Sequence, residues 1–331
     1  MRFLLPLVLL LTSCRKDGSG DSSRDSAPLL RVESTRPLMG TLFKIITHTA
    51  NRDQARLDME AAFDLAEDFA NRATDYEPDS ELNRLTRSPI GTPVKVSPHL
   101  FEVLLLGQKI TRETQGIFDP TYGPLTHLWR ETARTGRKPT PAEIAAARAR
   151  CGIEHLDFDR ENQTITVTLE KMQLDLGGIA KGYAADLIFD HLREKGYPQT
   201  LVAAAGDLRI GDAPPDKEAW SIGLRTFRLT PTDALPLKNC AVSTSGDLYQ
   251  RLTLGDQTHS HLIDPKTGLG LTTRRAASVV LPEAKLTDPL ATAACLSDTP
   301  LDLFKAYPWA SIRVLYQNPD IPPITTGVFA E

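Results

Sequence analysis

The segment that most restricts the local fold is a pair of adjacent glycines, Gly177 and Gly178, set between two regular segments. Before the pair, residues 164–168 alternate Thr with Ile and Val, which predicts a half-buried strand. After it, about residues 179–195 predict a helix. Asp175, followed by paired glycines at a helix start, lets a phosphate approach backbone N–H groups closely. The segment is therefore either a phosphate-binding turn or a tight turn that only needs glycine for its shape.

The rest of the chain predicts one large domain of mixed secondary structure. Its 331 residues are 41% hydrophobic and 24% charged, which is an ordinary globular composition. The formal net charge is −4 and no block of Lys and Arg stands out, so nucleic acid is not expected as a partner. Helices mixed with scattered strands predict an α+β or mixed α/β fold.

Periodicity and capping residues place the expected elements along the chain. Helices are predicted over about residues 52–73, from Ser97 to Gly116, from Thr140 to Gly152 and from Thr287 to Leu296. Further strands are predicted at 41–47, 198–204, 219–225, 276–281 and 311–317. One face of the first helix is expected to carry four apolar residues: Leu57, Ala61, Leu65 and Phe69.

The N-terminus predicts an exported lipoprotein. Arg2 precedes an apolar run over residues 3–11, and small residues then lead to Cys14. A basic start, a short apolar core and small residues before a cleavage point describe a secretory signal. Leu-Thr-Ser-Cys also resembles the bacterial lipobox, in which the cysteine is acylated, and a plain signal peptide is the alternative. The predicted parts are a lipoprotein signal peptide (1–13), a flexible tether (14–30) and one domain (31–331).

The body of the chain predicts neither a membrane span nor a complete disulfide framework. No apolar run approaches the ~18 residues that a spanning helix needs. Three cysteines, Cys151, Cys240 and Cys295, remain after the signal, and their spacings match no zinc motif. We expect most of them to be buried thiols, while a single disulfide stays open.

Two further segments carry side chains suited to chemistry. Asp288 and Thr292 are four residues apart, so they project from one helix face, where a carboxylate and a hydroxyl suit Mg²⁺. The alternative is that both cap the helix, which Thr287 is expected to open. His259 and His261 lie beside an Asp-Pro turn, either as structural histidines or as a metal pair.

These segments, taken together, closely resemble the ApbE family of FAD:protein FMN transferases. The likeness covers about residues 31–320, and its most specific element runs from Asp175 to Tyr183. The lipobox fits too, because many members are lipoproteins. The other motifs follow in the family's order: Met39-Gly40-Thr41, Tyr76 to Asn83, Gly116-Ile117-Phe118-Asp119-Pro120, Ser243-Thr244-Ser245-Gly246-Asp247, His261-Leu262-Ile263-Asp264-Pro265 and Asp288 to Thr292.

The resemblance implies a T-fold-like, mixed α/β domain that holds FAD in a groove between lobes. Members of the family cleave the pyrophosphate of FAD and transfer FMN to a threonine hydroxyl of an acceptor protein. The transfer forms a phosphoester bond and releases AMP. The acceptors are redox proteins of the cell envelope, including subunits of respiratory complexes.

The resemblance also implies roles for single residues. Asp288 and Thr292 match metal ligands, and Gly178 matches a further ligand position, where it offers only its carbonyl oxygen. His261 matches a histidine implicated in activity, and either His261 or Asp288 is expected to take the proton of the threonine hydroxyl. Some members carry an acidic residue where Ala291 stands, so a second metal ion stays open. The residues that match FAD contacts are Met39, Tyr76, Ile117, Phe118, Asp119, Asp175, Lys181 and Ile263.

The sequence therefore predicts an Mg²⁺-dependent FAD:protein FMN transferase, anchored by Cys14 to a membrane of the bacterial cell envelope. Its partners are FAD and an acceptor flavoprotein that presents a threonine. Two alternatives remain: an Mg²⁺-dependent pyrophosphatase that splits FAD into FMN and AMP, and a non-catalytic FAD-binding lipoprotein. Asp288 and Thr292 argue against the second alternative, since binding alone needs no metal site.

Overall fold

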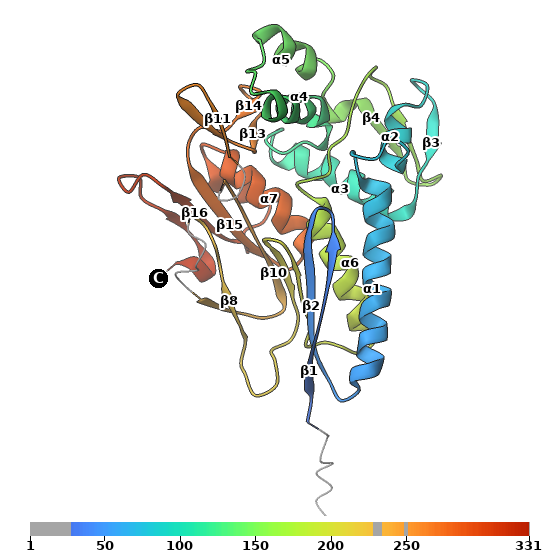
Figure 1. The fold of residues 1–331 in the computed structure, drawn as a ribbon, viewed down its shortest axis with the longest axis vertical. Helices are drawn as coiled ribbons and strands as arrows, with labels where there is room; N and C mark the ends of the chain where they lie inside the picture. The colour runs from blue at the N-terminus through green and yellow to red at the C-terminus, as the bar shows by residue number, and fades with distance from the viewer. Residues whose placement is uncertain (1–27, 228–233, 248–250, 331) are drawn as a thin grey trace, which may run out of the picture.

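The fold is organised by one eight-stranded antiparallel sheet (Figure 1). The computed structural model describes residues 28–227, 234–247 and 251–330. Neighbouring strands of the sheet pair in antiparallel register throughout. From one edge to the other the strands are β1 (Leu30–Leu38), β2 (Thr41–Thr49), β6 (Leu201–Ala204), β7 (Asp207–Ile210), β10 (Cys240–Gly246), β15 (Arg275–Leu281), β16 (Ser311–Tyr316) and β17 (Ile324–Thr325).

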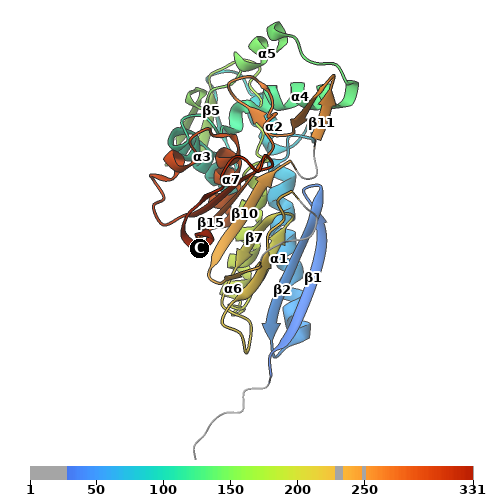
Figure 2. The same cartoon turned by 90° about the vertical axis from the view of Figure 1, so that its left-hand side faces the viewer.

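Three helices pack against one face of this sheet: α1 (Arg52–Ala73), α6 (Ala180–Glu194) and α7 (Ala284–Leu296). Figure 2 shows α1 and α6 lying along the strands. Side chains alternate between the two faces, so Ile45 of β2 joins the main core under the helices. Its neighbour Ile46 joins a smaller core on the other face, beneath the hairpin of β8 (Trp220–Gly223) and β9 (Ala234–Leu237).

A second group of elements lies at the upper end of the molecule in Figure 1. Its helices are α2 (Glu81–Thr86), α3 (Pro98–Glu113), α4 (Gly123–Thr135) and α5 (Pro141–Arg148). Its strands are β3 (Pro93–Lys95), β5 (Thr164–Val167) and β4 (Leu156–Asp159), with the hairpins β11–β12 (Arg251–Leu254, Gln257–Ser260) and β13–β14 (Ile263–Asp264, Leu269–Gly270). Short 3-10 turns complete it and the C-terminal part: η1 (Pro120–Tyr122), η2 (Ile153–His155), η3 (Pro300–Phe304) and η4 (Gly327–Phe329).

The predicted α/β fold class is confirmed, but the predicted apolar face of α1 is wrong. Leu57 is 66% exposed and Ala61 is exposed as well, whereas Phe69 is buried as expected. The helix faces the sheet and α6 with a neighbouring stripe at three- and four-residue spacing, which is richer in small side chains. That buried stripe comprises Ala55, Met59, Ala62, Phe63, Ala66, Phe69 and Ala73.

The start of α7 also differs from the prediction. Thr287 does not cap this helix, because the helix begins at Ala284, three residues earlier. The carboxylate of Asp186, on α6, accepts hydrogen bonds from the backbone N–H groups of Ala284 (3.0 Å) and Lys285 (2.8 Å). A neighbouring helix therefore satisfies the first turn of α7, and the Thr287 hydroxyl lies 2.7 Å from Ser243 Oγ instead.

The expectations for membrane spans and cysteines have separate outcomes. In the described ranges, no helix has the length and apolar character needed to cross a membrane. Cys151, Cys240 and Cys295 carry free thiols; Cys295 is buried as expected, and the other two are half-buried. The predicted signal peptide and Cys14 lie outside the described residues, so they stay predictions.

Candidate active site

The centre of the site, where the start of α6 meets α7, is an ion cluster of two buried carboxylates and one half-buried ammonium. Lys181 Nζ lies 3.3 Å from Asp288 Oδ2 and 3.5 Å from Asp207 Oδ2. The same ammonium donates a hydrogen bond of 2.9 Å to the carbonyl oxygen of Gly177. Asp207 and Asp288 are each only 4% exposed. Two carboxylates thus face one ammonium, and the cluster carries an excess of negative charge.

The pKa values of the cluster reflect this imbalance. Burial alone would lower the pKa of Lys181, but the charges of Asp288 and Asp207 outweigh it and raise that pKa above its usual range. Burial and the charge of Asp288 raise the pKa of Asp207, against the opposing effects of Lys181 and Ser243. The cluster therefore keeps its ammonium charged and still lacks positive charge, an environment that favours a further cation.

The predicted metal ligands lie together beside the cluster. Thr292 follows Asp288 by one helical turn, and its Oγ1 lies 3.0 Å from Ser245 Oγ. A Cβ built on Gly178 would lie 3.8 Å from Thr292 Oγ1, so the glycine turn borders this helix face.

The donor types fit Mg²⁺. The ion commonly takes one or two carboxylates and leaves other positions to water or phosphate, and Asp288, Thr292 and the Gly178 carbonyl offer only oxygen. Among the described residues, no group of three or more His, Cys, Asp or Glu side chains lies close enough together to hold a metal ion.

The lack of a side chain at Gly182 sets the spacing between α6 and α7. A Cβ on Gly182 would lie 2.2 Å from the carbonyl oxygen of Ala284 and 3.0 Å from Asp288 Cβ. Only glycine allows α6 to approach α7 this closely. The approach brings Lys181 to Asp288 and lets the N–H of Gly182 lie 3.3 Å from Asp288 Oδ2.

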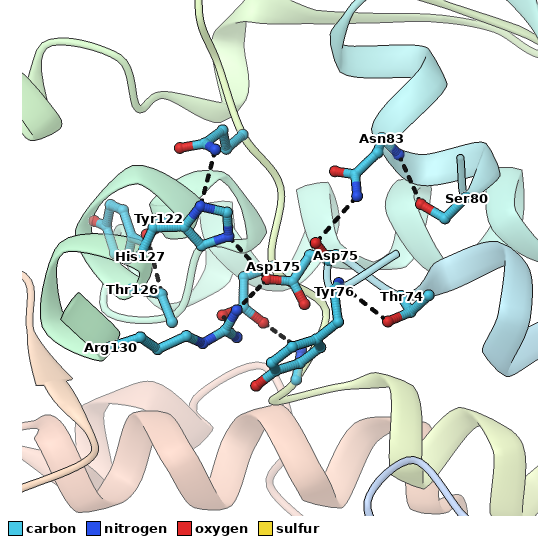
Figure 3. Close-up of polar contacts among 12 residues, drawn as sticks. Thr74, Asp75, Tyr76, Ser80, Asn83, Tyr122, Thr126, His127, Arg130 and Asp175 are labelled. Carbon is cyan, nitrogen blue, oxygen red and sulfur yellow. Dashed lines mark hydrogen bonds and ion pairs between the residues drawn. The ribbon is translucent and has the colours of Figure 1, made fainter. Parts of the chain in front are cut away.

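A second polar group surrounds Tyr76 (Figure 3). Arg130 of α4 bridges two carboxylates: it pairs with Asp75, and its Nη2 lies 3.0 Å from Asp175 Oδ2. The guanidinium carbon of Arg130 lies 4.3 Å from the centre of the Tyr76 ring, which is 71% exposed. Asp175 Oδ1 in turn accepts a hydrogen bond of 2.7 Å from the N–H of Gly177. The group thus connects an exposed aromatic ring to the glycine turn.

Three other predicted flavin contacts come from the elements around this turn. Met39 stands in the turn between β1 and β2, with a φ of 50°, and packs against the main core. Figures 1 and 3 both place that turn beside the start of α6. Ile117 and Phe118 follow α3; the Phe118 ring edge would lie 3.1 Å from a Cβ on Gly178.

Asp119 is engaged away from the ion cluster. Its Oδ1 accepts a hydrogen bond of 2.8 Å from the N–H of Thr121 and caps η1. Burial raises the pKa of Asp119 to about 6, against the pull of this hydrogen bond. The residue lines a cavity of about 440 Å³ together with Arg148 and Cys151. The structure therefore gives the Asp119 side chain a structural role beside its predicted contact.

The two histidines of the His-Ser-His sequence lie in different surroundings. His259 is 2% exposed, its Nδ1 donates to the carbonyl oxygen of Gly270 (2.8 Å), and its ring packs edge-on against Trp129. His261 is exposed. The structural interpretation therefore fits His259. The predicted contact Ile263 lies half-buried in β13, two residues further on.

The sequence analysis did not single out several residues that the structure places at the site. His127 and Arg130, both of α4, each contact Asp75, which follows α1. The only signals were the position of Asp75 directly before Tyr76 and the three-residue helical spacing of His127 and Arg130. Neither pattern has a chemical meaning until the fold brings α4 to the end of α1.

Comparisons with known proteins identify similar chains. The model of the ApbE family matches residues 39–305. A FAD:protein FMN transferase of Vibrio cholerae is 30% identical over 296 residues, which is 87% of this chain and 84% of that protein. A FAD:protein FMN transferase of Chlamydia muridarum is 28% identical and covers 88% of each chain.

Solved structures show the same fold. The flavin transferase ApbE from Vibrio cholerae superimposes with a TM-score of 0.80 at 25% identity, over 91% of this chain and 99% of that chain. The ApbE protein from Thermotoga maritima gives a TM-score of 0.80 at 25% identity, over 91% and 98% of the two chains. The likeness therefore extends over nearly all of both chains.

The close contact of α6 and α7 predicts unequal effects of alanine at two nearby glycines. Gly182→Ala should lower the free energy of unfolding by about 3 kcal/mol, because the added methyl meets a backbone oxygen; this outweighs the ~1 kcal/mol gained in helix propensity. Gly178→Ala should stay within about 1 kcal/mol, since only the Phe118 ring edge must move. Urea denaturation of both variants measures the difference, and equal losses would contradict this packing.

The raised pKa of Asp119 predicts a pH-dependent stability difference. Because the folded state holds the proton more tightly than the unfolded state, this carboxyl's stabilising contribution is fully present below about pH 4 and is lost as the pH rises to about 6. Asp119→Asn keeps an acceptor for Thr121 and removes the charge. The variant should therefore gain about 1–3 kcal/mol over the parent between pH 4 and pH 7. A stability difference that does not change with pH would show that this carboxyl does not titrate there.

Proposed function

The chain belongs to the ApbE family, and on that premise we propose that it is an Mg²⁺-dependent FAD:protein FMN transferase. The predicted family and the predicted enzyme class are those of its relatives. In the proposed reaction, a threonine hydroxyl of an acceptor protein attacks the FMN-side phosphorus of FAD. A phosphoester bond forms, the pyrophosphate bond breaks, and AMP leaves.

The observation that supports this proposal best is the ion cluster of Lys181, Asp207 and Asp288 beside the glycine turn. Asp288, Thr292 and the carbonyl of Gly178 would hold Mg²⁺, which when bound neutralises and orients phosphate groups. Lys181 adds a fixed positive charge at the first turn of α6. The helix is 15 residues long, and the N–H groups of its first turn favour an anion at this end.

The surroundings of the two candidate proton acceptors favour different roles for them. Asp288 is paired with Lys181, so its negative charge is already partly neutralised. It is also buried, so a threonine of an incoming protein cannot reach it easily. His261 is exposed and lies two residues before Ile263, a predicted flavin contact. Because the acceptor threonine approaches from solvent, His261 suits general-base work better, and Asp288 suits metal binding.

The membrane anchor and the acceptor class are part of the proposal. The apolar run at 3–11 and Cys14 support export and acylation, which would keep the enzyme at a membrane of the cell envelope. An acceptor in the same compartment is then a redox protein that presents an exposed threonine and carries FMN covalently after the reaction.

Removing the Asp288 carboxylate should abolish transfer. Wild-type protein, incubated with FAD, Mg²⁺ and a threonine-containing acceptor domain from the same organism, should add the mass of FMN to the acceptor. Asp288→Ala should reduce this rate at least ~100-fold, because a group that positions transition-state charge is lost. Intact mass spectrometry measures the product, and Asp298→Ala, an exposed aspartate just after α7, serves as the matched control.

Other outcomes of this assay separate the alternatives. Free FMN and AMP with an unmodified acceptor would favour the pyrophosphatase, and intact FAD with wild-type protein would favour a carrier. His261→Gln should retain Mg²⁺ affinity, measured by calorimetry, while transfer falls. If His261→Gln lost Mg²⁺ binding instead, the division of roles between His261 and Asp288 would be wrong.

Substitution of Cys14 tests the anchor separately. In cells fed a labelled fatty acid, the parent protein should carry the label and sediment with membranes. Cys14→Ser should lose the label and leave the membrane fraction, because no acyl acceptor remains at the cleavage site. A labelled Cys14→Ser protein would rule out acylation at this position.

A further inference from the structure

The polar group behind Tyr76 joins three separate segments of the chain (Figure 3). Arg130 comes from α4, Asp75 and Tyr76 follow α1, and Asp175 precedes α6. One guanidinium contacts all three partners: the two carboxylates through different nitrogens and the Tyr76 ring through its face. The planar fork of arginine suits this arrangement, since a lysine ammonium cannot bridge two carboxylates and stack on a ring at once.

We infer that Arg130 is a positioning residue of the flavin site, which fixes the plane of Tyr76 and the carboxylate of Asp175 before FAD binds. The inference rests on the proposed function, because it assigns these two side chains to flavin binding. Arg130 itself need not touch FAD. Its effect passes through the exposed ring of Tyr76 and through the hydrogen bond from Gly177 to Asp175.

The anchor of Arg130 is a buried carboxylate that remains charged. The Asp75 side chain is 6% exposed, and burial would raise its pKa. The hydrogen bonds from His127 and Arg130 outweigh burial and lower the pKa of Asp75 below its usual range. The charged Asp75 carboxylate therefore pairs with one nitrogen of the guanidinium, whose other nitrogen contacts Asp175.

His127 contributes to the anchor and is not available for proton transfer to substrate. Its Nε2 lies 3.0 Å from Asp75 Oδ2, and its Nδ1 lies 2.9 Å from the side-chain amide nitrogen of Gln173. With Gln173 as the donor to Nδ1, the Nε2–H of the ring donates to Asp75. Because both ring nitrogens are engaged, His127 acts as a support for Asp75.

The exposed face of the Tyr76 ring is the surface through which Arg130 is expected to influence FAD binding. The ring remains 71% exposed although the guanidinium lies 4.3 Å from its centre on one side. A flat heteroaromatic ring of the dinucleotide can stack on the other side. A ring held in one plane loses less freedom on binding than a mobile one, so Arg130 should strengthen FAD binding without a contact of its own.

The test measures FAD affinity in variants of Arg130. Binding is followed by quenching of flavin fluorescence with Mg²⁺ omitted, so that no FAD is consumed. Arg130→Gln should raise the Kd for FAD at least ~10-fold, and Arg130→Lys should recover little of the loss, because bridging requires the fork. Arg134→Gln is the matched control, because Arg134 lies one turn further on the same helix and, within the described ranges, pairs only with the exposed Glu131; this variant should bind FAD like the parent.

A double-mutant cycle separates positioning from general stability. If Arg130 acts through the ring, Tyr76→Leu should weaken FAD binding in the parent but have much less effect in the Arg130→Gln protein. If Arg130→Gln does not fold, the same cycle is measured with Arg130→Lys, which keeps the charge. Additive losses, or full rescue by lysine, would overturn the inference. A parent protein that neither binds FAD nor modifies an acceptor would instead overturn the proposed function.

Discussion

The contact between α6 and α7 at Gly182 is the constraint on which the rest of the site depends. Because no side chain separates the helices there, Lys181 reaches Asp207 and Asp288, and Asp186 reaches the first N–H groups of α7. One position without a methyl group thus fixes the helix spacing, the cap of α7 and the ion cluster together.

The two carboxylates of Asp207 and Asp288, which share the one ammonium of Lys181, affect both the stability of the fold and the chemistry of the site. Two desolvated carboxylates that share one ammonium are unfavourable in isolation, as the raised pKa of Asp207 indicates. Strand β10 offsets part of this, because the hydroxyl of Ser243 hydrogen-bonds Asp207 and so opposes the rise of its pKa. In the proposed function, the same imbalance would attract a divalent cation and the phosphates bound to it.

Local patterns predicted much of this molecule, and non-local contacts account for the rest. The bounds of α1 and the glycine turn follow from short-range periodicity and capping, and the four-residue spacing of Asp288 and Thr292 from helix geometry. The buried face of α1 was missed because several stripes of that helix are apolar. Thr287 was expected to cap α7, but the carboxylate of Asp186, about a hundred residues earlier in the chain, accepts hydrogen bonds from the first turn instead. No sequence motif marks Arg130, because its partners Asp75 and Asp175 lie 55 residues before it and 45 residues after it in the chain.

The first strand has a consequence for how the enzyme meets other proteins. β1 spans nine residues, so the point where the chain enters the fold and the turn at Met39 are ~30 Å apart. That turn lies beside the start of α6 (Figures 1 and 3). The proposed anchor at Cys14 would therefore hold the molecule at the end remote from the candidate site. An enzyme anchored in this way would present that site to acceptor proteins at a distance from the membrane surface.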